Sequence, residues 1–138
     1  MKLVRLPDGV VVRGRGLRNA FSGPAPDRGL YLGGSTLRAR HTFDWPHEWI
    51  DWPDFWLPRD RSLAVERIRA AHADALAGSM VEVACEGGHG RTGTVIACLA
   101  ILAGVAPGEA VEWTRGNYDE RAVETPWQRA WVKRFPAG

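Results

Sequence analysis

The feature that most constrains this chain is a glycine-rich segment, CEGGHGRTG, which runs from Cys85 to Gly93 between two apolar runs. Met80–Ala84 before it is brief and β-favouring, and Thr94–Ala103 after it is almost wholly apolar, which is typical of a buried helix. A strand that passes through a glycine-rich loop into a helix brings backbone N–H groups and the positive helix end together. The sequence therefore predicts an anion site, with phosphate as the natural guest.

The glycines explain how such a loop can close around an oxyanion. Those at positions 87, 88, 90 and 93 remove side chains that would keep the backbone amides at a distance, and they permit dihedral angles closed to other residues. We expect the segment after Cys85 to form the phosphate-binding loop, which comprises Glu86, Gly87, Gly88, His89, Gly90 and Arg91.

Three side chains of this segment suit phosphoryl transfer. Cys85 stands at the start of the cradle, where the helix end and Arg91 would stabilise a nucleophilic thiolate. Arg91 can hold two phosphoryl oxygens in a planar fork that lysine lacks. Thr92 places a hydroxyl beside the sulfur, where it can donate a hydrogen bond as a phosphoenzyme breaks down, or alternatively cap the helix. The loop thus supplies three predicted catalytic residues.

Cys85, Gly88, Arg91 and Thr92 resemble the Cys-x5-Arg-Ser/Thr signature of the protein tyrosine phosphatase superfamily, and residues 90–93 are similar to its dual-specificity and lipid-phosphatase branches. By this resemblance the chain is identified as a small, bacterial-like member related to dual-specificity and tyrosine phosphatases. The expected fold is α/β with three layers, a central, mainly parallel sheet flanked by helices, in a single domain over residues 1–138.

A second resemblance lies upstream, at the Trp-Pro-Asp of residues 52–54, which is similar to the mobile acid-bearing loop of tyrosine-specific members. A carboxylic acid on a loop that closes over substrate can protonate the leaving oxygen while it excludes water. Asp54 is the predicted general acid. Asp51 and Asp44 are alternatives close by, and Asp51 ranks before Asp44.

A third resemblance concerns the water that completes the reaction. Residues 124–128, Glu-Thr-Pro-Trp-Gln, resemble the Gln-Thr-x-x-Gln segment that positions the hydrolytic water in tyrosine-specific enzymes, with Glu124 in place of the first glutamine. The resemblance implies that Gln128 and Glu124 position water. The alternative is an ordinary capping box, because Thr125 stands three residues before Gln128 and Pro126 suits the first helical position.

Other residues modify the site. The family usually has histidine before the nucleophile, so Ala84 removes one contributor to thiolate stabilisation. Glu86 should repel highly phosphorylated substrates. His89 either contacts substrate or is simply solvated. Cys98 lies in an apolar helix, where it is expected to be a buried hydrophobe, with a redox partnership to Cys85 as the alternative.

The aromatic residues divide between core and cleft. Trp113, Trp127 and Trp131 occur at helical spacings and are predicted to fill the core. Phe55 and Trp56 follow the predicted acid and are expected to line a substrate cleft.

The rest of the chain predicts the scaffold. A turn at Pro7-Asp8-Gly9 predicts a hairpin, and a short strand is expected at Leu30–Leu32. The segment His41–Pro58, rich in tryptophan and proline, indicates an ordered loop. Helices are predicted from Asp60 or Ser62 to Gly78, from Pro107 to about Arg115, and from Thr125-Pro126 onward.

Composition bounds the remaining possibilities. A chain of 138 residues, 45% of them apolar, can bury one core. Its net charge is +2 and its arginines are scattered, so no face for nucleic acid is expected. The longest apolar run, Val95–Ala103, is far too short to cross a membrane, and two cysteines do not make a disulfide framework. We expect a cytoplasmic monomer that acts on a phosphorylated protein or small phosphoester, without metal, cofactor, nucleic acid or membrane.

The predicted activity is hydrolysis of phosphoric monoesters, on phosphotyrosine or with dual specificity, through a cysteinyl-phosphate intermediate. Phosphoinositides and sugar phosphates stay open as substrates. A non-catalytic phosphopeptide-binding module would keep Arg91 but lose the nucleophile or the acid, and both Cys85 and Asp54 are present. A nucleotide-binding loop would need lysine in place of Arg91, and a sulfurtransferase would not need the acid loop.

Overall fold

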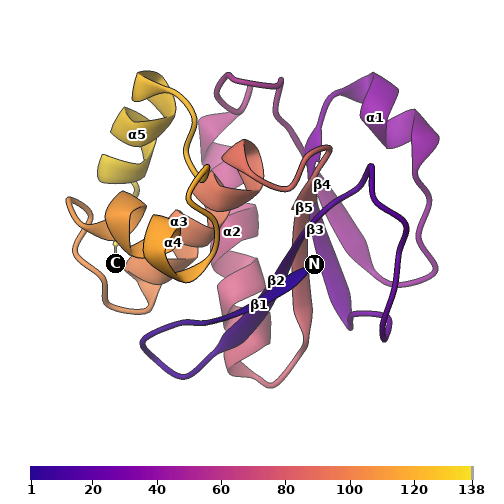
Figure 1. The fold of residues 1–138 in the computed structure, drawn as a ribbon, viewed down its shortest axis with the longest axis horizontal. Helices are drawn as coiled ribbons and strands as arrows, with labels where there is room; N and C mark the ends of the chain where they lie inside the picture. Colours follow the sequence, from indigo (N-terminus) through magenta and orange to yellow (C-terminus); the bar gives the residue numbers. More distant parts are fainter. Residues whose placement is uncertain (138) are drawn as a thin grey trace.

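The computed structural model describes residues 1–137 and contains one five-stranded sheet in the order β1-β2-β5-β3-β4 (Figure 1). Only β1 runs antiparallel to its neighbour, β2, and the other pairs are parallel. The strands are β1 (Lys2–Arg5), β2 (Val11–Gly16), β3 (Arg28–Gly33), β4 (His47–Asp51) and β5 (Val81–Cys85). The central strand, β5, therefore ends at the predicted nucleophile.

The helices cover the two faces of the sheet unequally. The helices are α1 (Ser35–Arg40), α2 (Arg61–Leu76), α3 (Gly90–Leu102), α4 (Ala110–Asn117) and α5 (Pro126–Lys133). α2 and α3 pack on one face, and α4 and α5 pack against α3, whereas α1 lies apart from them beside β3 (Figure 1). The three-layer α/β fold with a mainly parallel sheet is confirmed, with a thin layer on the α1 side.

Side-chain alternation along β5 explains the two layers, because successive residues of a strand face opposite sides. Val83 and Cys85 lie in the main core beneath α2 and α3. Ala84 faces the other way and packs with Tyr31 and Leu37 in a smaller core. A strand with apolar residues on both faces is typical of the centre of a parallel sheet.

A buried ion cluster lies on the α1 face, around Glu82 of β5. The Glu82 carboxylate is fully buried and accepts hydrogen bonds from Nε of Arg13 at 3.1 Å and Nε of Arg15 at 2.6 Å. The Tyr31 hydroxyl donates to the same carboxylate at 2.8 Å and accepts from Nε1 of Trp45. Burial and the Glu82 charge both raise the pKa of Tyr31, so its hydroxyl stays a donor.

Several predicted elements are confirmed. The hairpin about Pro7 joins β1 to β2. Asp60 caps α2, since its side chain accepts from the Leu63 N–H at 3.1 Å. Thr125 caps α5, which begins at Pro126.

Other expectations were wrong. The segment predicted as loop from His41 to Pro58 contains the strand β4, α1 was not predicted, and α4 begins at Ala110 rather than Pro107. Trp127 is not in the core but 43% exposed. Over residues 1–137, no helix is both long and apolar enough to cross a membrane.

Candidate active site

The loop after β5 forms the cradle that the glycines predict. Cys85 is buried, and the backbone N–H of Gly88 donates to its Sγ at 3.2 Å. Gly88 can point this N–H inward because it adopts a φ of +81°, which favours glycine. α3 begins at Gly90, so the positive end of a buried helix faces the same place. The surroundings of Cys85 thus favour an anionic guest.

The end of strand β2 and the residues after it pack against the glycine-rich loop that follows β5. The chain after β2 continues beside the loop, with the Leu17 N–H donating to Cys85 O at 2.8 Å and the Arg18 N–H to Glu86 O at 3.0 Å. The two backbones touch, because a Cβ on Gly16 would lie 2.6 Å from Gly87 O, and one on Gly88 would lie 2.5 Å from the Gly16 nitrogen. Glycine on both segments is what allows the contact.

Two residues that follow α4 hold the other side of the loop. The Tyr118 hydroxyl donates to Gly88 O at 2.6 Å, and Nδ1 of His89 lies 2.7 Å from the Asp119 carboxylate. Burial is the main cause of a raised pKa of Tyr118, and the nearby Cys85 adds to it, so the hydroxyl remains protonated. Burial alone would raise the pKa of Asp119, but hydrogen bonds from the Arg121 N–H and His89 outweigh it and lower the pKa. His89 is therefore partnered rather than simply solvated.

Sequence reasoning missed Tyr118 and Asp119. They lie outside the glycine-rich motif, some thirty residues after it, and no local pattern marks them as neighbours of the loop. Only the packing of α4 against α3 brings them there.

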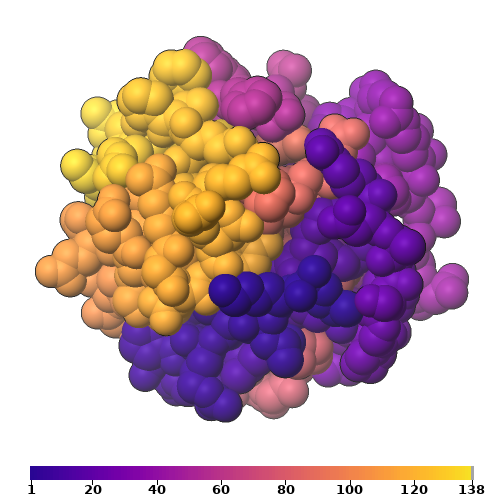
Figure 2. Space-filling model, viewed as in Figure 1, coloured from indigo at the N-terminus to yellow at the C-terminus, as the bar shows by residue number. Residues whose placement is uncertain are grey.

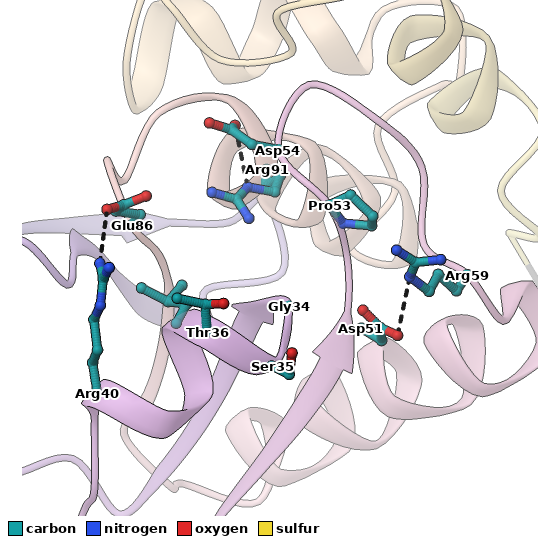
Figure 3. A pocket seen from close by; sticks show the side chains of 11 residues that line it. Gly34, Ser35, Thr36, Arg40, Asp51, Pro53, Asp54, Arg59, Glu86 and Arg91 are labelled. Atoms are coloured by element: carbon teal, nitrogen blue, oxygen red, sulfur yellow. Dashed lines mark ion pairs between the residues drawn. The ribbon is translucent and has the colours of Figure 1, made fainter.

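Arg91 joins the cradle to the predicted acid loop. Its side chain is 5% exposed. Nη1 donates to Trp52 O at 2.9 Å, and Nε lies 3.5 Å from the Asp54 carboxylate (Figure 3). The structure thus places the predicted acid and the predicted phosphate-binding guanidinium in one site.

Thr92 lies one residue beyond Arg91 and is fully buried. Its hydroxyl has no hydrogen-bond partner among residues 1–137, whereas Thr94 Oγ1 donates to Gly90 O at 2.7 Å. The N-cap position of α3 is His89, so Thr92 lies inside the helix and does not cap it. Its hydroxyl is free to serve an intermediate in the cradle.

Hydrogen bonds within the acid loop, residues 52–58, and from α5 hold this loop in place. Nε1 of the buried Trp52 donates to Trp56 O at 2.8 Å. Nε1 of Trp127 donates to Phe55 O at 2.7 Å, and Nε2 of Gln128 donates to Trp56 O at 3.0 Å. Phe55 has a φ of +59°, a strained value for a bulky residue that surrounding contacts must hold.

The two predicted water-positioning residues are placed differently. Gln128 is fully buried, with its side-chain oxygen accepting from the Glu124 N–H at 3.0 Å and its backbone N–H donating to Thr125 Oγ1 at 3.2 Å. This is close to the capping box that the sequence also allowed. The side-chain amide of Gln128 is thus engaged in structural hydrogen bonds, whereas the Glu124 side chain lines the cavity beside Cys85.

The cavity at Cys85 has a volume of about 90 Å³. Phe55 lines it, as predicted for a cleft residue, and Trp56 instead packs against Trp127 with ring centroids 5.3 Å apart. The lining residues are Arg18, Asp54, Phe55, Cys85, Gly87, His89, Gly90, Arg91, Arg121 and Glu124.

A larger groove of about 780 Å³ adjoins this cavity and shares Asp54 and Arg91 with it. In the groove Asp51 pairs with Arg59 at 3.2 Å, and Glu86 faces Arg40 at 3.9 Å (Figure 3). Asp44 lines a separate cavity beside the loop that follows β2. Of the three candidate acids, Asp54 is the one that lines the cavity with Cys85.

Solved structures of phosphatases share this fold. Tk-PTP in its active form superposes with a TM-score of 0.70 at 21% identity, over 96% of this chain and 95% of that one. Kinase associated phosphatase, with its catalytic-site cysteine replaced by serine, gives a TM-score of 0.70 at 12% identity, over 96% of this chain and 92% of that one. The fold is that of the protein tyrosine phosphatases.

The family follows from the sequence match. A family model described as "Swiss Army Knife protein, DSP-PTPase phosphatase domain" (PTP-SAK) matches residues 54–134, and this chain belongs to that family. An uncharacterised protein of Methanocaldococcus jannaschii, MJECL20, is 38% identical over 92 residues, which make up 65% of this chain and 59% of that protein. The chain spans about one third to three fifths of the length of the curated relatives that it matches.

Proposed function

We propose that this chain hydrolyses phosphomonoesters through a cysteinyl-phosphate intermediate. The observation that carries the proposal is that Asp54 and Arg91 lie 3.5 Å apart in the cavity that Cys85 also lines. A nucleophile, a phosphate-binding fork and a proton donor in one small site are what phosphoryl transfer to a thiolate requires.

In the first step, the Cys85 thiolate attacks phosphorus in line with the leaving oxygen. The S–P bond forms as the P–O bond breaks, and Asp54 transfers its proton to the departing oxygen. The loop N–H groups and the Arg91 guanidinium hold the other phosphoryl oxygens, where negative charge develops.

In the second step, a water molecule attacks phosphorus while the Asp54 carboxylate accepts its proton. The S–P bond breaks, and the sulfur leaves as a thiolate that accepts from the Gly88 N–H, 3.2 Å away in this structure, and from the Thr92 hydroxyl. Inorganic phosphate is released and the carboxyl is protonated again. In this scheme Glu124 is the nearer candidate for holding the water, because it lines the cavity.

For the substrate we infer a phosphorylated protein, with phosphotyrosine favoured by the aromatic rim at Phe55, which is 52% exposed beside the cavity. A second candidate is a non-protein phosphoester. PTPMT1, a structure of similar fold, was solved in complex with PI(5)P, with a TM-score of 0.59 at 19% identity. We place the non-catalytic module last, because the nucleophile and the acid both lie in the cavity.

The test is hydrolysis of p-nitrophenyl phosphate and of phosphotyrosine and phosphothreonine peptides by the purified chain. Cys85→Ser should abolish turnover while phosphate binding persists, and Asp54→Asn should lower kcat most for the peptides, whose leaving groups need a proton. A rapid-quench experiment should trap phosphate on the wild-type protein. Undiminished turnover by Cys85→Ser, or phosphate binding by the wild type without turnover, would contradict the proposal.

A further inference from the structure

Two exposed arginines flank the cavity at Cys85. Arg18 follows β2 and Arg121 follows α4, and both are exposed and line the cavity. Within residues 1–137, neither guanidinium makes a hydrogen bond or an ion pair, whereas the groove arginines, Arg40 and Arg59, both face carboxylates. Two guanidinium groups without a direct carboxylate contact thus lie at the rim of this cavity.

The backbone holds both arginines in place while their charged ends stay free. The Arg18 N–H donates to Glu86 O, and Nη2 of Arg18 lies 3.6 Å from the position that a Cβ on Gly87 would occupy. The Arg121 N–H is fixed to the Asp119 carboxylate at 2.7 Å. Figure 2 shows the segment after β5 at the bottom of a hollow between the indigo N-terminal part and the orange C-terminal part, the two parts from which these arginines come.

The acidic residues nearby balance this charge only in part, because Asp119 interacts electrostatically with Arg121 but does not line the cavity. Asp54 and Glu124 are the carboxyl groups that line the cavity, and Asp54 carries a proton in the reactive form proposed above. Glu86 was expected to repel highly phosphorylated substrates, but its carboxylate lies in the neighbouring groove and faces Arg40. With Arg91 occupied by the reacting phosphate, the cavity lining keeps two arginines, Arg18 and Arg121, and one unprotonated carboxylate, Glu124.

We propose that Arg18 and Arg121 bind a second anionic group of the substrate. The preferred substrates are then phosphomonoesters that carry another phosphate or carboxylate close to the one removed. This inference rests on the proposed function and specifies its substrate class. Arginine suits the task because its fork binds carboxylate and phosphate in a bidentate way.

The experiment compares phenyl phosphate with 3-carboxyphenyl phosphate, whose phenol leaving groups are of nearly equal acidity. The wild type should show a higher kcat/KM for the carboxylated ester. Arg18→Gln and Arg121→Gln should each lower this preference, the ratio of the two kcat/KM values, about three- to tenfold, as loss of a charge-assisted hydrogen bond predicts. The control Arg5→Gln, an exposed arginine on β1, should leave the preference unchanged.

Three further measurements complete the test. Raising the ionic strength should weaken the preference, since exposed charges are screened by salt. Nucleoside monophosphates compared with their 3′,5′-bisphosphates, and inositol monophosphate compared with a bisphosphate, show which scaffold carries the second anion. Calorimetric binding of both aryl esters to Cys85→Ser tests the arginine subsite separately from the proposed hydrolysis. If the wild type shows no turnover, the proposed hydrolysis is refuted, but the binding preference can still be measured. Equal affinity for the two esters, or a preference that survives both arginine substitutions, overturns the arginine subsite.

Discussion

The acid loop is expected to depend on α5 for its catalytic position. Trp127→Phe removes the N–H that donates to Phe55 O at 2.7 Å but keeps an aromatic ring against Trp56. Gln128→Leu removes the donor to Trp56 O at 3.0 Å. Each hydrogen bond contributes about 1 kcal/mol, so the double variant should weaken loop closure by about 2 kcal/mol, or about 30-fold.

The leaving group reports whether this effect acts through the acid. Nitrophenolate is a good leaving group that departs without a proton, whereas phenolate needs a proton from the acid. The kcat/KM of the double variant should therefore fall by up to about 30-fold for phenyl phosphate and far less for p-nitrophenyl phosphate. Trp113→Phe is the matched control, because it changes a partly buried tryptophan of α4 that packs on the core. An equal fall with both esters, accompanied by a lower Tm, would refute the reasoning and assign α5 a purely structural role.

Three further predictions concern the supports of the site. Tyr118→Phe leaves the carbonyl of Gly88 without its donor and should lower kcat/KM about tenfold with a circular dichroism spectrum like that of the wild type; unchanged kinetics would contradict it. Because folding lowers the pKa of Asp119 from its ordinary value of 3.8, the ionised carboxylate stabilises the fold at pH values above 3.8. This stabilisation is lost as the pH falls through the pKa of the folded state. In urea titrations the stability difference between wild type and Asp119→Asn should therefore be full at neutral pH and shrink below about pH 4, and a constant difference would argue against the carboxylate's role. Glu82→Gln leaves two buried arginines without a countercharge and should lower the free energy of unfolding by about 3 kcal/mol, which a thermal melt can check; an unchanged Tm would show that the cluster is not needed.

Local sequence patterns predicted the parts of the fold that depend on neighbouring residues. The run from Met80 through the glycines to Ala103 corresponds to β5, the cradle and α3, because strand propensity, glycine freedom and apolar length all act locally. The caps at Asp60 and Thr125 were predictable for the same reason.

The elements that were missed depend on tertiary contacts. β4 has five residues between prolines, too few to show an alternating pattern, and it forms because β3 offers an edge for it. Within the candidate site, Cys85, Arg91 and Asp54 could be found from motifs. Tyr118, by contrast, reaches Gly88 only because of helix packing, and the partner of Gln128 is a carbonyl 72 residues away.

The contact between the cradle and β2 sets a limit on mutational tolerance. A methyl group on Gly14 would meet the Tyr118 ring at about 2.5 Å, and one on Gly16 would meet Gly87 O at 2.6 Å. Gly14→Ala and Gly16→Ala would therefore disturb catalysis from a strand that carries no reacting group. The site thus depends on a discontinuous set of glycines, because two glycines of β2, some seventy residues before Cys85, make room for Tyr118 and for the loop. A homologue that keeps the cysteine loop but bears side chains at those two positions must arrange Tyr118 and the loop differently.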